Sequence, residues 1–271
     1  MPLLTAFLLG ALQGFAELFP FSSLGLLVIL PHVAHFIVPA QGARYLPFLV
    51  ALHFGTALAL LWYFRQQWMR IIRGFVHWFR GNKSSDGRMA WLLIWGTIPA
   101  GLAGLLLKHK IAGLFGRPLI AALFLVVNGL FLLWGSRRSR YQNHQALSQM
   151  TGREALKVGL YQMFALIPGL SRSGLTIVAG LREGLSPEEA AHFSFLLATP
   201  IILAAALLEL PKLHHHGVHG LLVPAMLGGV VAYAVAWLST RFLLRYFRTH
   251  RLATLGWISI ALGAIAILAV H

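Results

Sequence analysis

The chain has 271 residues, of which 58% are hydrophobic and 11% charged, and its mean hydropathy is +0.74. This composition excludes an ordinary soluble globule and indicates a protein that crosses a membrane several times. The net charge is +15, but the basic residues lie in short stretches between apolar segments. We therefore expect membrane lipids as partners, with anionic headgroups beside those stretches, and no nucleic acid. The chain has no cysteine, which excludes disulfides and thiolate metal sites, and no basic residue precedes Arg44, so we expect no cleaved signal peptide.

Six uninterrupted apolar segments are long enough to cross about 30 Å of hydrocarbon as helices. They lie at 46–64, 89–107, 118–136, 190–210, 221–240 and 252–270. Two more, at 3–30 and 157–181, are interrupted at Pro20-Phe21-Ser22-Ser23 and from Pro168 to Gly174. Broken helices at membrane depth are tolerated only where they are buried in protein or line a cavity, so each indicates a re-entrant helix pair. A single kinked spanning helix is the alternative in each case.

The sequence therefore predicts an all-α polytopic membrane protein. It forms a single integral membrane domain over 1–271, with about six transmembrane helices and two re-entrant helix pairs.

Basic residues predict the topology of this domain. Loops 65–88, 137–157 and 241–251 are rich in Lys and Arg, whereas loop 212–220 carries only Lys212. The positive-inside rule places the rich loops in the cytoplasm, provided that the second broken segment returns to the side it entered. The second broken segment then enters from the cytoplasm and the first from outside. Three basic residues in loop 108–117 blur this contrast.

The two halves of the chain resemble each other. Gly10-Ala11-Leu12-Gln13-Gly14-Phe15-Ala16 is similar to Gly159-Leu160-Tyr161-Gln162-Met163-Phe164-Ala165, and Ala51 to Gly55 is similar to Ala190 to Ser194. Three spans follow each broken segment, and an odd number of crossings per half makes the repeat inverted. We predict inverted repeats over 1–136 and 157–271. Such repeats place a ligand site where their broken helices meet.

The first break supplies a carboxylate. Glu17 is the only acid before Asp86, and Gln13 lies four residues earlier on the same helix face. Glu17 can hold Mg²⁺ or Ca²⁺, pair with an arginine, or shuttle a proton; a buried, protonated acid that is hydrogen-bonded for packing is the alternative. Ser22 and Ser23 can bind phosphate oxygens, and one of them can serve as a nucleophile; helix capping and close packing are the alternatives for either serine.

The second break, Pro168-Gly169-Leu170-Ser171-Arg172-Ser173-Gly174-Leu175-Thr176, supplies an arginine. An arginine at bilayer depth costs about 2.5–3.5 kcal/mol and marks a functional site by default. Its planar fork between two serines suits a phosphate, and the glycines let the backbone approach an anion. We predict that Ser171, Ser173, Gly174 and Thr176 bind phosphate beside Arg172. The alternative is an arginine on a short surface loop.

If the halves meet, these side chains form a polar island suited to a phosphate or diphosphate headgroup whose apolar tail stays in the lipid. The histidines are less informative. His53 and His192 occupy matching places in the two halves. Either could point inward, but we expect each to be a packed or interfacial side chain. His32 and His35 should lie near the outer surface, and the run from His214 to His219 should be a polar turn rather than a metal site.

The chain resembles the bacterial undecaprenyl-diphosphatase family, the bacitracin-resistance membrane proteins. The resemblance covers nearly the full length, with Pro-Gly-x-Ser-Arg-Ser-Gly-x-Thr intact at Pro168 to Thr176 and a similar stretch from Glu189 to Leu197. It implies six spanning helices plus two re-entrant regions in an inverted repeat, in the bacterial inner membrane. It also implies removal of one phosphate from the polyprenyl diphosphate that recycles the cell-wall lipid carrier, aided by a divalent cation.

The first motif departs from the family pattern Glu-Gly-x-x-Glu-Phe-Leu-Pro-x-Ser-Ser-Thr-Gly-His. Matching positions are Glu17, Pro20, Ser22, Ser23 and Gly25, whereas Gln13, Leu24 and Leu26 replace the first glutamate, the threonine and the histidine. Glutamine offers only a neutral oxygen, so we expect Mg²⁺ or Ca²⁺ to be weakly held at Glu17. The lost histidine is the family's proposed nucleophile or general base, and such a loss typically lowers a rate by about 10²–10⁴.

Two functions from different classes remain. In the first, a phosphatase, Arg172 grips the diphosphate, Glu17 binds the cation, and Ser23 or a relocated histidine assists attack. In the second, a translocase moves a polyprenyl phosphate between leaflets after losing hydrolytic activity, as the opposed re-entrant segments suggest. A membrane scaffold leaves the buried charges unexplained. The sequence leans to the enzyme and leaves a homodimer open.

Overall fold

The computed structural model describes residues 1–33, 46–107, 111, 113–114, 117–138, 145–211, 221–249 and 252–270, and the regular structure in these ranges is helical. The helices are α1 (Leu3–Ala16), α2 (Ser23–Val33), α3 (Leu46–Tyr63), α4 (Arg65–Trp78), α5 (Ser85–Leu106), α7 (Pro118–Arg138), α8 (Gly152–Phe164), α9 (Arg172–Arg182), α10 (Pro187–Glu209), α11 (Leu222–Thr249) and α12 (Leu252–Val270), with a 3₁₀ turn η2 (Leu147–Gln149). The predicted all-α class is confirmed.

Among the described residues, six helices are long and apolar enough to cross a membrane: α3, α5, α7, α10, α11 and α12. They coincide with the six predicted spans. The main difference is at α11, which continues to Thr249 rather than ending near 240. Arginine is a good helix former, so the basic stretch extends this helix instead of ending it.

One predicted loop is wrong, because 65–88 contains the helix α4 and the first turn of α5. The segment is amphipathic: Ile71 is buried, whereas Arg70 and Arg73 are exposed. Apolar residues at helical spacing give the segment a face that packs on α5, and the arginines occupy the opposite face. The basic residues correctly marked this segment as lying between two spans. They did not show that its apolar residues recur at helical spacing.

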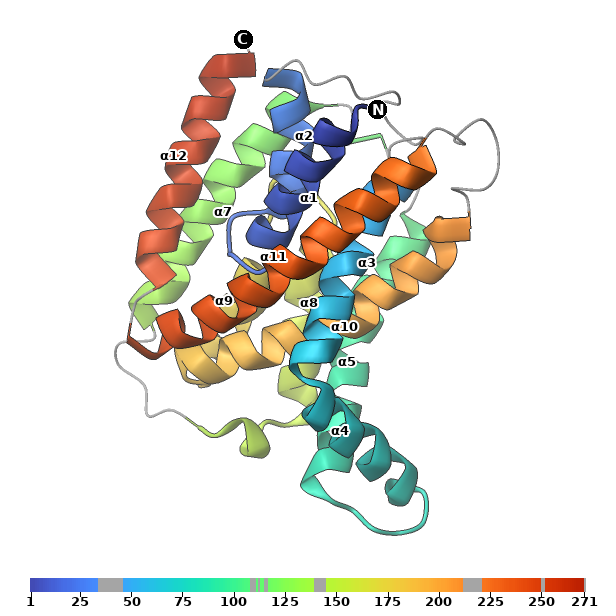
Figure 1. The fold of residues 1–271 in the computed structure, drawn as a ribbon. Helices are drawn as coiled ribbons and strands as arrows, with labels where there is room; N and C mark the ends of the chain where they lie inside the picture. Colours follow the sequence, from blue (N-terminus) through green and yellow to red (C-terminus); the bar gives the residue numbers. More distant parts are fainter. Residues whose placement is uncertain are drawn as a thin grey trace.

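Both broken segments are confirmed as pairs of short helices, α1 with α2 and α8 with α9. Figure 1 shows α1 and α2 in the upper half of the molecule and α8 and α9 in the lower half, so the two breaks approach each other at middle height. This is the arrangement that opposed re-entrant pairs require. The repeat boundaries, 1–136 and 157–271, stay a prediction.

Small residues hold the first broken segment against α11. A β-carbon on Gly10 would overlap the carbonyl oxygen of Gly228, and one on Gly14 would overlap that of Ala232. The two glycines are four residues apart, so they form one smooth stripe that lets the helix backbones approach closely. With this stripe on α11, the polar side chains at the end of α1 face the centre of the protein.

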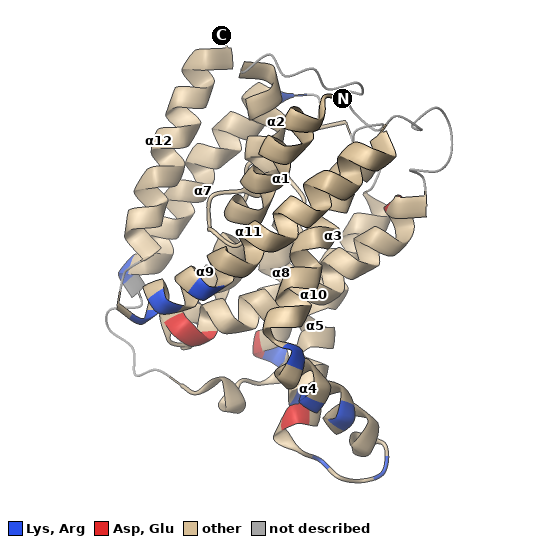
Figure 2. Cartoon of the chain, viewed as in Figure 1, with Lys and Arg blue, Asp and Glu red and all other residues tan. Residues whose placement is uncertain are grey.

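Basic residues form a cluster at the lower end of the molecule, on α4 and at the lower end of α11 (Figure 2). By the positive-inside rule this end is the expected cytoplasmic side. Part of the predicted evidence lies outside the described residues: His35, Lys108, Lys110, and the run from His214 to His219.

Candidate active site

An amide on α7 ties the two breaks together. Asn128 donates a hydrogen bond to the carbonyl of Pro20 in the first break (2.7 Å) and accepts one from the backbone N–H of Ser171 in the second (2.9 Å). It also donates to the hydroxyl of Ser259 on α12 (3.0 Å). The side chain is fully buried. Asn128 therefore fixes the distance between two chain segments that approach from opposite ends.

Each break contains a turn with unusual backbone geometry. Ser22 has a φ of +33°, and its hydroxyl accepts from the N–H of Gly25 (3.1 Å) and donates to the carbonyl of Leu170 (3.1 Å). It thus caps α2 and forms a second tie between the breaks. In the other break, Gly169 has a φ of +100°, and a β-carbon there would overlap the carbonyl oxygen of Ala121. Only glycine satisfies both conditions.

Two serines attach α9 to the first break. Ser171 caps this helix by accepting from the N–H of Gly174 (3.1 Å), and Ser173 donates to the carbonyl of Phe19 (3.1 Å). The Oγ atoms of the two serines lie 3.1 Å apart. One turn later, Thr176 donates to the carbonyl of Arg172 (2.8 Å). These bonds orient the start of α9 so that Arg172 projects toward the first break.

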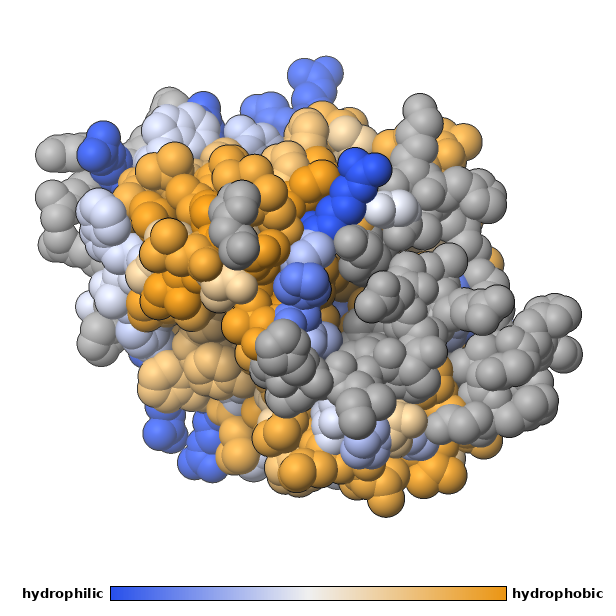
Figure 3. Space-filling model, turned by 90° about the horizontal axis from the view of Figure 1, so that it is seen from above, coloured by the Kyte–Doolittle hydropathy of each residue, from blue (hydrophilic) through white to orange (hydrophobic). Residues whose placement is uncertain are grey.

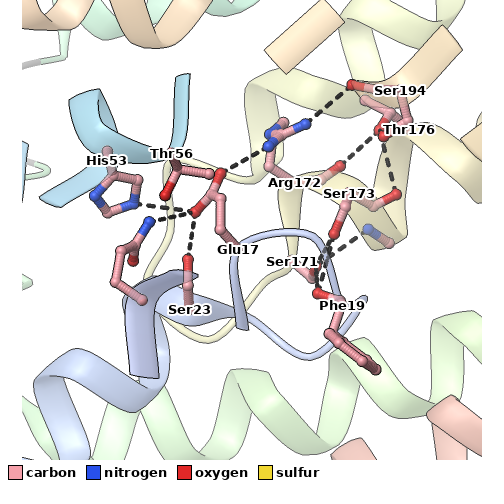
Figure 4. Close-up of polar contacts among 12 residues, drawn as sticks. Glu17, Phe19, Ser23, His53, Thr56, Ser171, Arg172, Ser173, Thr176 and Ser194 are labelled. Atoms are coloured by element: carbon pink, nitrogen blue, oxygen red, sulfur yellow. Dashed lines mark hydrogen bonds and ion pairs between the residues drawn. The ribbon is translucent and has the colours of Figure 1, made fainter. Parts of the chain in front are cut away.

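At the centre, Arg172 and Glu17 form an ion pair of 2.6 Å between Nη2 and Oε1 (Figure 4). Their side chains are 13% and 6% exposed. The other terminal nitrogen of Arg172 donates to the carbonyl of Ser194 on α10 (3.0 Å). The sequence predicted this pairing of a carboxylate from one half with a guanidinium from the other, and the structure confirms it. Burial strengthens the attraction and makes an unpaired partner costly.

The second oxygen of Glu17, Oε2, gathers three more side chains. Ser23 donates to it at 2.6 Å, Gln13 donates at 3.0 Å, and His53 Nε2 lies 3.3 Å away. The opposite ring nitrogen of His53 donates to the carbonyl of Leu49 (2.8 Å), which leaves Nε2 as the nitrogen that faces the carboxylate. The expectation that His53 is merely packed or interfacial is therefore wrong.

These groups line a cavity of about 330 Å³. Its polar lining consists of Glu17, Ser22, Ser23, His53, Ser171, Arg172 and Glu209, and its remaining walls are apolar. Its lining reaches Leu46 at the start of α3 and Glu209 at the end of α10, near the end of the molecule away from the basic cluster (Figure 1). Viewed from above, the described surface at this upper end is largely hydrophobic (Figure 3). A polar floor under apolar walls suits an amphiphile with an anionic head.

Four of the residues predicted to bind substrate are not among those that line the cavity: Gln13, Ser173, Gly174 and Thr176. Each is hydrogen-bonded to a residue that does line the cavity: Glu17, Ser171 or Arg172. Their direct contact with phosphate stays a prediction. The bonds described above already give Ser173, Gly174 and Thr176 a role in positioning Arg172.

A divalent cation beside Glu17 stays a prediction. Among the described residues there is no group of three or more His, Cys, Asp and Glu side chains that could hold a metal ion alone. However, the carbonyl oxygen of the Gln13 side chain is buried without a hydrogen-bond partner in the described part of the chain, and its amide is bonded to Glu17. Mg²⁺ usually takes few protein oxygens and completes its shell with substrate phosphates and water.

The residues that sequence reasoning missed are Asn128, Ser194 and His53. Asn128 is a lone amide within an apolar span, and such polar residues are costly in lipid unless they bond within the protein. That signal was available. Nothing local pointed to the backbone carbonyl of Ser194 or to the approach of His53 toward Glu17. By contrast, His192, the counterpart of His53, bonds to Gln67 (2.8 Å) and is packed, as expected.

The chain has clear relatives. The family model for bacitracin resistance protein BacA matches residues 6–265. Undecaprenyl-diphosphatase 2 of Burkholderia lata is 52% identical over 92% of this chain and 90% of its own length. Undecaprenyl-diphosphatase 1 of Burkholderia pseudomallei is 49% identical over 94% and 92%. Undecaprenyl-diphosphatase 2 of Chromobacterium violaceum is 43% identical over 99% of both chains.

Proposed function

The chain belongs to the BacA family of bacitracin resistance proteins, and from that membership we propose that it hydrolyses undecaprenyl diphosphate to undecaprenyl phosphate and inorganic phosphate. The observation that carries the proposal is the buried Glu17–Arg172 pair at the floor of an apolar cavity. This activity recycles the lipid carrier of cell-wall synthesis in the bacterial inner membrane. It also gives the retained arginine and serines a chemical use.

Arg172 binds the diphosphate. Its guanidinium is held by Glu17 and by the carbonyl of Ser194, so its plane is fixed before the substrate arrives. A fixed cationic fork stabilises the charge that develops on phosphate oxygens during transfer. The hydroxyls of Ser22 and Ser171 line the same cavity beside it.

Ser23 is the nucleophile that the geometry favours. Its hydroxyl donates to Glu17 at 2.6 Å, so Glu17 is placed to take the proton while Oγ attacks the terminal phosphorus. The bond from that phosphorus to the bridging oxygen breaks, and undecaprenyl phosphate leaves with the oxygen. Water then attacks the phosphoserine; the stored proton returns to Ser23, inorganic phosphate leaves, and one proton passes to solvent.

His53 has the role of the family histidine, whose position is occupied by Leu26 in this chain. Its Nε2 lies 3.3 Å from the same Glu17 oxygen that accepts from Ser23. A proton taken from Ser23 can therefore pass from the carboxylate to the imidazole and back without leaving the cavity. This compensation explains how a chain with Leu26 keeps the rest of the site.

A weakly held divalent cation assists the hydrolysis. Glu17 and the free carbonyl oxygen of Gln13 would hold it. When bound, it supplies positive charge to the phosphate oxygens. Because the cavity lining extends to the end away from the basic cluster, the site opens to the outer side of the membrane, and inorganic phosphate leaves there.

The test uses purified protein with Mg²⁺ or Ca²⁺ and undecaprenyl diphosphate. We expect phosphate release that Arg172→Ala abolishes, whereas Lys157→Ala, which removes an exposed basic residue on α8, should leave it unchanged. Ser23→Ala should abolish both turnover and any phosphoserine detected by mass spectrometry. If the wild-type protein releases no phosphate but exchanges labelled polyprenyl phosphate between leaflets of vesicles, the translocase is correct and the phosphatase is wrong.

A further inference from the structure

A second cavity lies beside the site cavity, along α5. This tail groove, as we call it, has a volume of about 470 Å³ and lies between α4, α5 and one residue of α10. It is lined mostly by apolar side chains such as Trp68, Phe75 and Leu93, together with Thr97, Gly101 and Leu105. The hydroxyl of Thr97 is bonded to the carbonyl of Leu93 (2.7 Å), so the groove presents an apolar surface.

The groove and the site cavity share two lining residues. Gly101 and Leu105 line both of them, on the face of α5 that lies between the two spaces. The site cavity supplies the anion-binding groups at one end, and the groove leads from it toward α4 at the lower end of the molecule (Figure 1). A ligand with a charged head and a long apolar chain matches a polar cavity that is followed by an apolar groove.

The glycines of α5 keep the junction open. A β-carbon on Gly101 or on Gly104 would meet no atom within 4 Å. This differs from Gly10 and Gly96, where a neighbouring atom fills the space above the α-carbon. Glycine in a helix interior is less favourable than alanine. At Gly101 that cost is not offset by close helix packing, so the absent side chain leaves room for something outside the protein.

We propose that the tail groove binds the polyprenyl chain of the substrate whose diphosphate lies in the site cavity. This inference rests on the proposed function. The chain leaves the diphosphate at Gly101 and Leu105 and runs between α4 and α5 toward the lower end. A lipid entering from the outer leaflet has its head toward the upper end and its tail below, which is the order of the two cavities.

The groove acts through position rather than affinity. Lipid tails are as apolar as the groove, so moving the polyprenyl chain from the bilayer into it gains little free energy beyond packing. However, a fixed exit for the tail sets the place of the attached diphosphate. Displacement of a reacting group by about 1 Å can cost about 10²-fold in rate. The groove therefore selects long-tailed substrates by placing their terminal phosphorus near Ser23.

A size series at Gly101 tests this proposal. Gly101→Ala, Gly101→Leu and Gly101→Phe should lower kcat/KM for undecaprenyl diphosphate progressively, by about 10²-fold for phenylalanine. Turnover of dimethylallyl diphosphate, whose tail is too short to reach the groove, should not change. Ala264→Phe is the matched control, because it places the same aromatic ring at an exposed position on α12. Leu105→Trp narrows the same junction from an exposed side chain if the Gly101 variants fail to fold.

Photo-crosslinking gives a readout that does not depend on turnover. A polyprenyl phosphate with a diazirine in its tail should label α4 and the lower half of α5, and Gly101→Phe should remove this label. An equal loss of activity on both substrates, or labelling that Gly101→Phe leaves unchanged, would overturn the proposal. Absence of phosphate release from the wild-type protein with labelling intact would instead overturn the phosphatase and leave the groove standing.

Discussion

Breaking the Glu17–Arg172 pair should reveal a strong coupling between its members. Removing one partner of a buried ion pair costs about 3–5 kcal/mol, because the remaining charge is left uncompensated. The two single variants should not be equal. In Arg172→Gln, Glu17 keeps Ser23, Gln13 and His53. In Glu17→Gln, Arg172 keeps only the carbonyl of Ser194 among the bonds described here. We therefore expect Glu17→Gln to lie at the upper end of that range and Arg172→Gln at the lower end.

The double variant tests whether the charges depend on each other. Glu17→Gln with Arg172→Gln removes both charges, so its cost should fall below the sum of the single costs by about 2–3 kcal/mol. The measurement is the free energy of unfolding in mixed micelles, from wild type, both single variants and the double variant. The control is the exposed pair Arg248–Glu188, which has a similar distance of 2.8 Å and side chains that are 63% and 44% exposed. Its double variant should show no measurable coupling. Additive costs at Glu17 and Arg172 would refute a buried, mutually dependent pair.

Three further predictions concern the supports of the site. Asn128→Leu should lower both stability and kcat, by about 1–3 kcal/mol in stability, because it leaves the N–H of Ser171 and the carbonyl of Pro20 unpaired; an unchanged midpoint of thermal unfolding would contradict this. His53→Ala should lower kcat by about 10²–10⁴, and adding Leu26→His should restore part of it in the same phosphate assay; no rescue in a folded variant would argue against compensation. Gln13→Glu should tighten binding of Mg²⁺ or Ca²⁺, seen as a lower metal concentration for half-maximal activity, and an unchanged value would place the cation elsewhere.

Local signals in the sequence were sufficient for the membrane class, the six spans and the two breaks. An apolar run of about 20 residues specifies a transmembrane helix by itself, because its length and hydropathy are properties of consecutive residues. The same holds for the Pro- and Gly-containing breaks and for the arginine within the second one. The amphipathic helix α4 was missed because its arginines suggested a solvated loop, although Ile71 and Phe75 recur at helical spacing.

The pairing of Glu17 with Arg172 could also be predicted, because an inverted repeat brings its two breaks together. What the sequence did not contain is the set of contacts between segments far apart in the chain. The approach of His53 to Glu17, the bridge formed by Asn128, and the opening beside Gly101 each depend on how three or more helices pack. A residue's own neighbours in sequence fix its helix and depth, but only tertiary packing decides which side chains share a cavity. The sequence alone determined that a carboxylate and a guanidinium lie buried in the membrane; the folded arrangement of helices decided which histidine serves them and where a lipid tail can leave.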